Sequence, residues 1–289
     1  EYRLFAVKGR PVRNPDGTIR EWVGIHADIT ARDAYEIALK EARDAGTRVL
    51  MVIDGPDELE ELMAPPGLKE AVVYADQRLK RAKTMRITRP GGTDLTVQLG
   101  EYPTMSQYGY AETAGRFDHW GAGHVHTFPN EGSANGTVVF APGDIIVLPY
   151  CRYVQDEVRL DIRDGFIRKI EGGLDAKLMS DWLDGNKANS GDMDGHAISH
   201  LGWGLNPQAR WDAIALNGAD PKRHHAGARC FAGNFLFSTG PNSQSGGKRT
   251  TKGHYDVPMR DCTVTLDNDV IIEHGRFADE KMRVMRVAR

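Results

Sequence analysis

Two side chains that can bind a metal ion lie two positions apart in the segment Gly253-His254-Tyr255-Asp256. Residues i and i+2 of a β-strand point to the same face, so an imidazole nitrogen of His254 and a carboxylate oxygen of Asp256 would project side by side. This pair predicts a site for one divalent ion. The alternative for so short a motif is a surface histidine with an aspartate nearby.

A third ligand must come from elsewhere in the chain, and His200 is the best source. It lies in the segment 198–207 among small and apolar residues and is followed by Gly202-Trp203-Gly204. The glycines predict a strand that leads into a tight loop where the backbone passes close to another group. Two histidines and one carboxylate make the facial triad of non-haem Fe(II) oxygenases, which leaves positions open for substrate and O2. A buried structural histidine is the alternative here.

A second group of histidines follows Arg116 and comprises His119, His124 and His126. We favour His119 as the functional residue, because Asp118 is placed to orient its ring and neutral imidazole suits proton transfer near pH 7. The spacing of His124 and His126 would also put both on one face of a strand, where they could bind a metal. The alternative is that they are surface histidines on a loop.

A polar, glycine-rich stretch follows the predicted strand 235–237 and contains Ser238, Asn242 and Gly246-Gly247-Lys248. Such a loop can approach an anion or a hydroxylated ring closely, because glycine has no side chain. Its spacing is not that of a Walker phosphate loop. The pair His224-His225 lies in a charged segment, and we predict that it is solvated.

Composition limits the class of protein. The chain has 289 residues, of which 40% are hydrophobic and 27% charged, as in an ordinary soluble globular protein that can hold two domains. A net charge of -3 argues against nucleic-acid binding. No apolar run reaches membrane-spanning length, and no signal peptide is visible. The three cysteines are scattered, which favours reduced thiols in the cytoplasm.

The first 45 residues form one predicted unit. Strands at 2–7 and 22–29 flank the turn Asn14-Pro15-Asp16-Gly17, which predicts a hairpin. The segment 10–30 resembles the last two strands of a PAS sensor domain. One hairpin and one helix cannot enclose a ligand, so we do not expect a sensor function. A fused or residual segment is the better explanation.

The rest of the chain is predicted to contain two further parts. A helix through 31–45 is expected to end at Gly46, and 46–100 is expected to be the remnant of an N-terminal α/β domain before a catalytic domain at 101–289. The fold class is therefore α+β, a partial α/β layer followed by a β-rich domain. The remaining predicted strands are 48–53, 85–89, 94–99, 136–140, 144–148, 158–162 and 166–170, and the remaining predicted helices are 57–63, 68–82 and 176–184.

Several long stretches together resemble one family. From about 46 to 282 the sequence is similar to the 2,5-dihydroxypyridine 5,6-dioxygenases, the Fe(II) enzymes that cleave the ring in nicotinic-acid degradation. The matching stretches are 100–103, 108–111, 115–120, 129–131, 198–205, 233–242, 246–249 and 254–256. The family's usual N-terminal domain is longer, and the PAS-like piece stands in place of its first part.

The resemblance implies iron ligands at His200, His254 and Asp256 and a catalytic domain of the M29 metallo-aminopeptidase type. It implies a homo-oligomer that converts 2,5-dihydroxypyridine and O2 into N-formylmaleamic acid by opening the ring between C5 and C6. We expect no nucleic-acid or membrane partner. The candidate catalytic residues are His119, Tyr108 and Ser238, and the candidate substrate-binding residues are Trp203, Trp120 and Asn242.

A metal-dependent aminopeptidase of the related fold is the alternative enzyme. Those enzymes have a two-metal site, in which paired ions hold the attacking and leaving oxygens. They carry a glutamate where this chain has His200 and a histidine in the strand that here reads 235–237. Glu131 remains as a carboxylate for a second ion, but a single ion with two histidines and one carboxylate favours oxygen chemistry. A non-catalytic sensor led by the PAS-like piece is a third class.

Overall fold

The computed structural model describes residues 5–13, 16, 19–28, 41–42, 44–52, 56–218 and 226–287. The chain divides into two compact units: a first unit, residues 1–51 with 110–119, and a second unit, residues 52–109 with 120–289. The domain boundaries at 45 and 100 that the sequence suggested stay predictions.

The first unit contains the predicted hairpin. Strand β1 (Phe5–Arg13) pairs antiparallel with β2 (Ile19–Asp28), and Phe5 lies opposite Asp28. Short strand β3 (Val49–Met51) pairs in parallel with β7 (Phe117–His119), which follows much later in the chain. Most of the helix predicted for 31–45 lies outside the described residues. Its end is described: Gly46 has a φ of 75°, the left-handed conformation that favours glycine after a helix.

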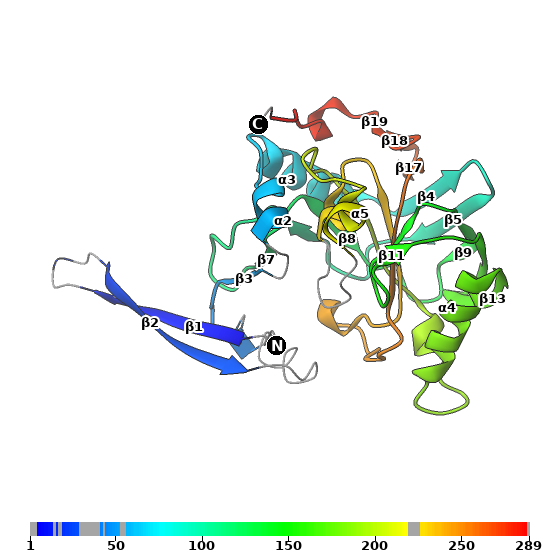
Figure 1. Cartoon of the computed structure of the whole chain (residues 1–289), viewed down its shortest axis with the longest axis horizontal. Helices are drawn as coiled ribbons and strands as arrows, with labels where there is room; N and C mark the ends of the chain where they lie inside the picture. The colour runs from blue at the N-terminus through cyan, green and yellow to red at the C-terminus, as the bar shows by residue number, and fades with distance from the viewer. Residues whose placement is uncertain are drawn as a thin grey trace. The chain divides into compact units, whose positions relative to one another are not determined.

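Two antiparallel sheets build the second unit (Figure 1). The larger has eight strands, in the spatial order β13 (Phe166–Gly172), β12 (Val158–Arg163), β9 (Asn135–Phe140), β5 (Thr93–Gln98), β4 (Thr84–Arg89), β17 (Thr263–Leu266), β18 (Asp269–Glu273) and β19 (Arg276–Phe277). The smaller has five, in the order β16 (Tyr255–Met259), β15 (Phe235–Thr239), β14 (Ile198–Gly204), β8 (His124–Thr127) and β6 (Met105–Gln107). A separate pair joins β10 (Ile145–Ile146) and β11 (Arg152–Tyr153).

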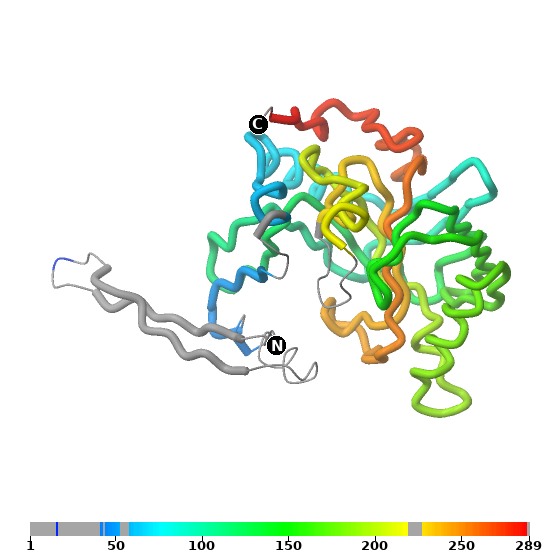
Figure 2. Tube along the Cα trace, viewed as in Figure 1, coloured from blue at the N-terminus to red at the C-terminus, as the bar shows by residue number. Residues whose placement is uncertain are grey.

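Helices of the second unit are short apart from α3 and α4. They are α2 (Pro56–Glu61), α3 (Leu68–Arg81), α4 (Leu174–Gly185), α5 (Ala213–Asn217) and α6 (Ala226–Cys230), with 3-10 turns at Asp194–His196, Ser243–Ser245 and Glu280–Met282. Helix α3 buries one face, as its 3.6-residue apolar period predicts. The C-terminal segment runs beside this helix (red and cyan in Figure 2), where the Tyr74 hydroxyl donates to Asp279 over 2.8 Å. None of the described helices is long and apolar enough to cross a membrane.

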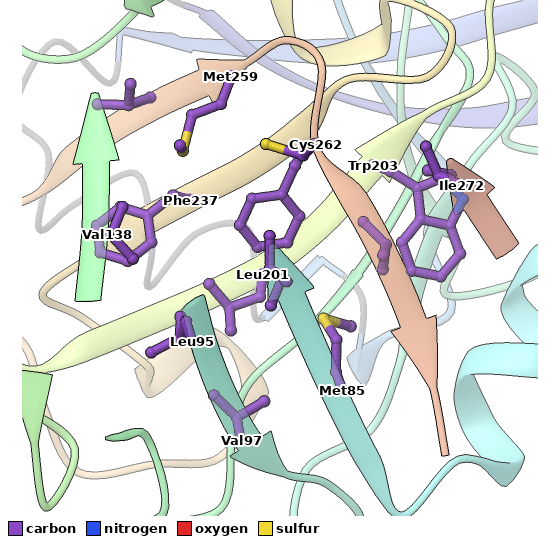
Figure 3. Packing of buried hydrophobic residues seen from close by; sticks show 14 of the residues in the cluster. Met85, Leu95, Val97, Val138, Leu201, Trp203, Phe237, Met259, Cys262 and Ile272 are labelled. Atoms are coloured by element: carbon purple, nitrogen blue, oxygen red, sulfur yellow. The ribbon is translucent and has the colours of Figure 1, made fainter. Parts of the chain in front are cut away.

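The hydrophobic core lies between the two sheets of the second unit. Figure 3 shows Leu95 and Met85 of the large sheet packed towards Leu201 of the small one. The rings of Phe140 and Phe237 bridge the sheets in the same layer, with centroids 5.5 Å apart. Alternate residues of each strand enter this layer, as the two-residue period of strands requires. The small sheet therefore packs one face into the core, and its other face lies outside this hydrophobic layer.

The predicted α+β class is confirmed, with small differences at element ends. The segment 144–148 is a strand only at 145–146, because the amides of Val147 and Leu148 turn to bond the carbonyl of Asp256 instead of continuing the ladder. Gly202-Trp203-Gly204 does not start a loop but completes β14, since these residues pair with β8 throughout.

Candidate metal centre

Strand β14 presents different chemistry on its two faces. Leu201 and Trp203 point into the hydrophobic core, where both are fully buried. Gly202 lies opposite His126 of β8, and facing residues of an antiparallel pair share one side of the sheet. The pairing of β14 with β15 is irregular between Ile198 and Leu201, and His200 lies within that irregularity.

Glycine is required at two points of β14. A Cβ at Gly202 would lie 2.7 Å from the Cβ of His126, and one at Gly204 would lie 2.4 Å from the carbonyl carbon of Cys230. Real Cβ atoms do not approach other groups so closely. The prediction that these glycines permit a close backbone approach is confirmed, although the neighbours are β8 and the end of α6.

The structure brings His200, His254 and Asp256 together. One potential ligand atom from each residue lies within 4.8 Å of the others, and among the described residues these are the three-donor group that the geometry picks out for a metal ion. Asp256 is fully buried in β16, and His254 immediately precedes that strand. Strand pairing thus joins residues that are more than fifty positions apart in sequence.

Each of the three is held by a hydrogen bond. The Ser238 hydroxyl donates to the backbone oxygen of His200 over 2.8 Å. Nδ1 of His254 lies 2.6 Å from the backbone oxygen of Thr239; a carbonyl only accepts, so Nδ1 carries the proton and Nε2 carries the lone pair. Oδ2 of Asp256 accepts from Nε of Arg229 over 2.8 Å. The bond to Thr239 fixes the tautomer of His254, the bond from Arg229 orients the carboxylate of Asp256, and the bond from Ser238 holds the backbone of His200.

Two buried atoms of the group lack hydrogen-bond partners, and they test whether a cation fits. They are Oδ1 of Asp256 and Nδ1 of His200; Oδ1 also lies 3.9 Å from Nε2 of His200. Unsatisfied buried polar atoms are costly and rare in native proteins. Burial also lowers the pKa of His200 well below its usual value, and nearby His126 and His254 add to this effect. A neutral imidazole and a carboxylate oxygen are what a divalent cation requires, so the residues fit such an ion.

Two more imidazoles lie on the strand next to β14, and one of them adjoins this group. His124 and His126 lie on β8, are 6% exposed each, and stack with centroids 5.5 Å apart. The ring centre of His126 is 5.1 Å from that of His200. Burial lowers the pKa of His126 to about 4, so this side chain is neutral near pH 7. The alternative of surface histidines on a loop is therefore wrong for both residues, while their shared face on a strand is confirmed.

A buried polar network fixes the segments next to the ligands. The guanidinium of Arg249 donates to the backbone oxygens of Gly240 and Ile198 over 3.0 and 3.1 Å, and to Glu131 over 2.5 Å. Asn242 accepts the amide of Arg249 and donates to Glu131 over 2.7 Å. Asn242 thus belongs to this network, and its predicted role in substrate binding stays a prediction. Glu131, the carboxylate considered for a second ion, is occupied by these partners and by the Tyr102 hydroxyl.

The other candidate residues lie in different surroundings. His119 belongs to the first unit, where its backbone amide donates to Asp118 and its ring meets Phe117 edge-on at 4.9 Å. Asp118 also pairs with Arg116 over 2.5 Å. Trp203 is fully buried in the core, on the face of the sheet opposite Gly202 and His126, so the structure does not bring it to the ligand group.

Tyr108 and Trp120 complete the candidate list. Tyr108 is buried in the core, and the ammonium of Lys69 lies 5.4 Å from its ring centre. Trp120 is half-buried, and its indole N–H donates to the backbone oxygen of Leu59 over 2.9 Å. The roles assigned to His119, Tyr108 and Trp120 stay predictions. His224-His225 lies outside the described residues.

Sequence reasoning missed Arg229, whose side chain is 12% exposed beside Asp256. It belongs to α6, and no spacing rule connects it with an aspartate 27 positions later. A basic residue between apolar neighbours in Ala228-Arg229-Cys230-Phe231 is the signal that could have found it.

Comparisons with known proteins agree on one family. The family described as 2,5-dihydroxypyridine 5,6-dioxygenase matches residues 29–279. The 2,5-dihydroxypyridine 5,6-dioxygenase of Pseudomonas putida is 40% identical over 230 residues, which are 80% of this chain. The chain spans 64% of the length of that relative.

Solved structures support the same fold. The 2,5-dihydroxypyridine dioxygenase from Pseudomonas putida KT2440 superposes with a TM-score of 0.79 at 39% identity, covering 85% of this chain and 69% of that one. AmpT from Thermus thermophilus superposes with a TM-score of 0.57 at 14% identity, covering 86% of this chain and 69% of that one. The second likeness concerns the fold alone, and it confirms the expected aminopeptidase-like architecture.

Proposed function

This chain belongs to the 2,5-dihydroxypyridine 5,6-dioxygenase family, and from that premise we propose that it is an Fe(II)-dependent dioxygenase that cleaves the ring of a dihydroxylated pyridine. The observation that carries the proposal is the convergence of two imidazoles and one carboxylate, with donor atoms within 4.8 Å of one another. His200, His254 and Asp256 would hold the ion. Once bound, Fe(II) supplies a Lewis-acidic, redox-active centre with open positions for a ring hydroxyl and for O2.

The proposed reaction takes 2,5-dihydroxypyridine and one O2 to N-formylmaleamic acid. The C5–C6 bond breaks, and both oxygen atoms enter the product, so the atoms balance without a further reductant. The electron-rich ring is the reductant. A substrate hydroxyl must lose its proton to bind as an anion, and His119 is the proposed acid/base residue. The proposal also includes a homo-oligomer in the cytoplasm that takes part in nicotinate-type breakdown.

The residues around the site contribute in three ways. Burial of His200 and Asp256 excludes water, which strengthens electrostatic interactions with a bound anion. The neutral His126 ring and the Phe128 ring lie next to His200, with ring centres 5.1 and 5.9 Å away, and meet each other edge to face. Ser238 keeps His200 in place through its backbone oxygen. Its proposed catalytic role therefore includes positioning.

A two-metal aminopeptidase remains the alternative, because the fold is shared with AmpT. The described part of the chain favours the dioxygenase, since the acidic side chain considered for a second ion is engaged by Arg249, Asn242 and Tyr102. Hydrolysis and oxygen chemistry need different metals and substrates, so they can be separated directly.

The test is anaerobic reconstitution of the full chain with Fe(II), followed by O2 uptake with a panel of dihydroxypyridines and a catechol. We expect one O2 consumed per 2,5-dihydroxypyridine, with loss of the ring absorbance. A parallel arm loads Zn(II) or Co(II) and assays peptide hydrolysis. O2 uptake with the pyridine supports the proposal; peptide hydrolysis without O2 uptake would replace it with the aminopeptidase.

A further inference from the structure

The two oxygens of Asp256 have different partners. Oδ2 accepts a hydrogen bond from Nε of Arg229 over 2.8 Å, whereas Oδ1 is buried without a hydrogen-bond partner. The side chains of Asp256 and Arg229 are 1% and 12% exposed, so water does not compete strongly for this pair. One oxygen is thus occupied by a cationic donor, and the other is directed to the histidine group, 3.9 Å from Nε2 of His200.

Arg229 is itself fixed to the strand that carries His200. The fully buried amide of Asn234 donates to the backbone oxygens of Ala228 and Arg229 over 2.7 and 3.1 Å, and its Oδ1 accepts from the amide of Gly204 over 2.6 Å. Further backbone bonds join the same segments, including Asn206 N to Cys230 O at 2.8 Å. The C-terminal end of α6 is therefore tied to the end of β14.

We propose that Arg229 is a positioning residue of the metal centre, which holds Asp256 so that only Oδ1 is presented to the ion. This inference rests on the proposed function, because it requires Asp256 to be a ligand. A carboxylate free to rotate can bind a cation through one oxygen or both, and a donor fixed on Oδ2 favours the one-oxygen mode. That mode leaves one more position open for substrate or O2.

Charge and geometry make separable contributions. The guanidinium has a rigid, planar set of donors, whereas lysine is a flexible point charge. A lysine at 229 would keep the positive charge near Asp256 but lose the directed Nε–H. If the directed hydrogen bond to Asp256 matters, lysine cannot fully restore metal binding. If only the positive charge matters, lysine can restore it.

The test titrates Co(II) alone into the metal-free full chain, with isothermal calorimetry for affinity and visible absorption for coordination. For Arg229→Met we expect roughly 10- to 100-fold weaker Co(II) binding, the usual effect of losing a group that orients a ligand, together with a shifted Co(II) spectrum. The Co(II) affinity of Arg229→Lys is expected to fall between those of the unaltered chain and Arg229→Met. Its Co(II) spectrum is expected to be shifted as in Arg229→Met. Arg210→Met removes a partly exposed arginine, 41% exposed, that pairs with Asp212, and is expected to change neither readout.

The outcomes separate the two proposals. Unchanged affinity and spectrum in Arg229→Met would overturn the positioning role while leaving O2 uptake by the unaltered chain as evidence for the dioxygenase. If Arg229→Met does not fold, Arg229→Lys decides, because wild-type affinity and spectrum in that variant would equally overturn the role. If the unaltered chain binds no Co(II) or Fe(II), the proposed function fails first.

Discussion

A Cβ atom at Gly202 would lie 2.0 Å from the backbone oxygen of Val125, so the strand that carries His200 admits no side chain at this position. The contact is between backbones of two neighbouring strands, and neither can move without disturbing the core beneath Leu201 and Trp203. The close pairing of β14 and β8 thus sets how near the imidazole of His126 comes to that of His200.

Gly202→Ala is expected to lower the free energy of unfolding by about 3 kcal/mol or more, because overpacking against backbone cannot be relieved by a rotamer change. Urea unfolding of the metal-free protein measures this. Gly185→Ala is the matched control: a Cβ there meets nothing within 4 Å, and alanine is expected to be neutral or slightly stabilising. Equal effects of the two substitutions would contradict the packing argument.

His254→Ala is expected to abolish stoichiometric metal binding, since it removes one of three donors and leaves the carboxylate and one imidazole. Metal content after reconstitution and gel filtration, and the dissociation constant for Co(II), are the measurements. His274→Asn removes an exposed imidazole outside the group and should retain full metal content; asparagine tolerates the left-handed backbone there, with φ of 46°. A His254→Ala protein that kept its metal and its activity would show that the ligand assignment is wrong.

Arg249→Met is expected to destabilise the fold by about 2–3 kcal/mol, because two buried backbone oxygens and Glu131 lose a charged donor. It should also weaken Co(II) binding, since Ile198 and Gly240 belong to the strand and loop that carry His200 and precede His254. Thermal unfolding and calorimetry report the two effects. Lys248→Met, at the exposed neighbouring position, should alter neither.

The stability of the metal-free protein is expected to depend on pH through His126. Burial lowers the pKa of His126 to about 4, while the unfolded chain has an ordinary value near 6.5. Below about pH 6.5 the unfolded state takes up a proton that the folded state does not, so stability is full above that pH and falls as the pH drops towards 4. The loss reaches at most about 3 kcal/mol.

Urea unfolding between pH 4.5 and 7.5 tests this dependence. His126→Gln, which cannot titrate, should reduce the slope of the curve in that window, whereas His274→Asn should leave the slope unchanged. A slope that is identical in the unaltered chain and in His126→Gln would assign the acid sensitivity to other groups, such as His200 and His196, whose pKa values burial also lowers.

Much of the candidate site could be predicted from local pattern. The two-residue spacing of His254 and Asp256 indicated that these side chains lie close together, and the structure groups them with His200 at the start of β16. The glycines beside His200 indicated a close backbone approach, which the structure has, although they lie within β14 and not in a loop. The hairpin at the start and most helices and strands of the second unit were also predictable, because turn residues and apolar periodicity act over short distances.

Other features depend on contacts between distant segments, which a single sequence does not reveal. His119 looked better than His124 and His126 because Asp118 adjoins it, yet only strand pairing shows that His126 approaches His200 and that His124 stacks on His126. Trp203 looked like a wall residue, but the register of β14 turns it into the core. Arg229 stands out locally only as a basic residue among apolar neighbours, and nothing in that pattern names its partner Asp256, 27 positions later.

Strand β14 has core residues on one face and His200 in its irregular stretch, and all seven of its residues are buried. Amide hydrogens in such a strand exchange with solvent only when the whole unit opens, rather than through local fluctuations. The slowest-exchanging amides should therefore be those of β14, which carries His200. Loading the site with a metal should slow their exchange further, by an amount that corresponds to the full free energy of metal binding. Hydrogen–deuterium exchange would thus read metal affinity directly as protection of β14.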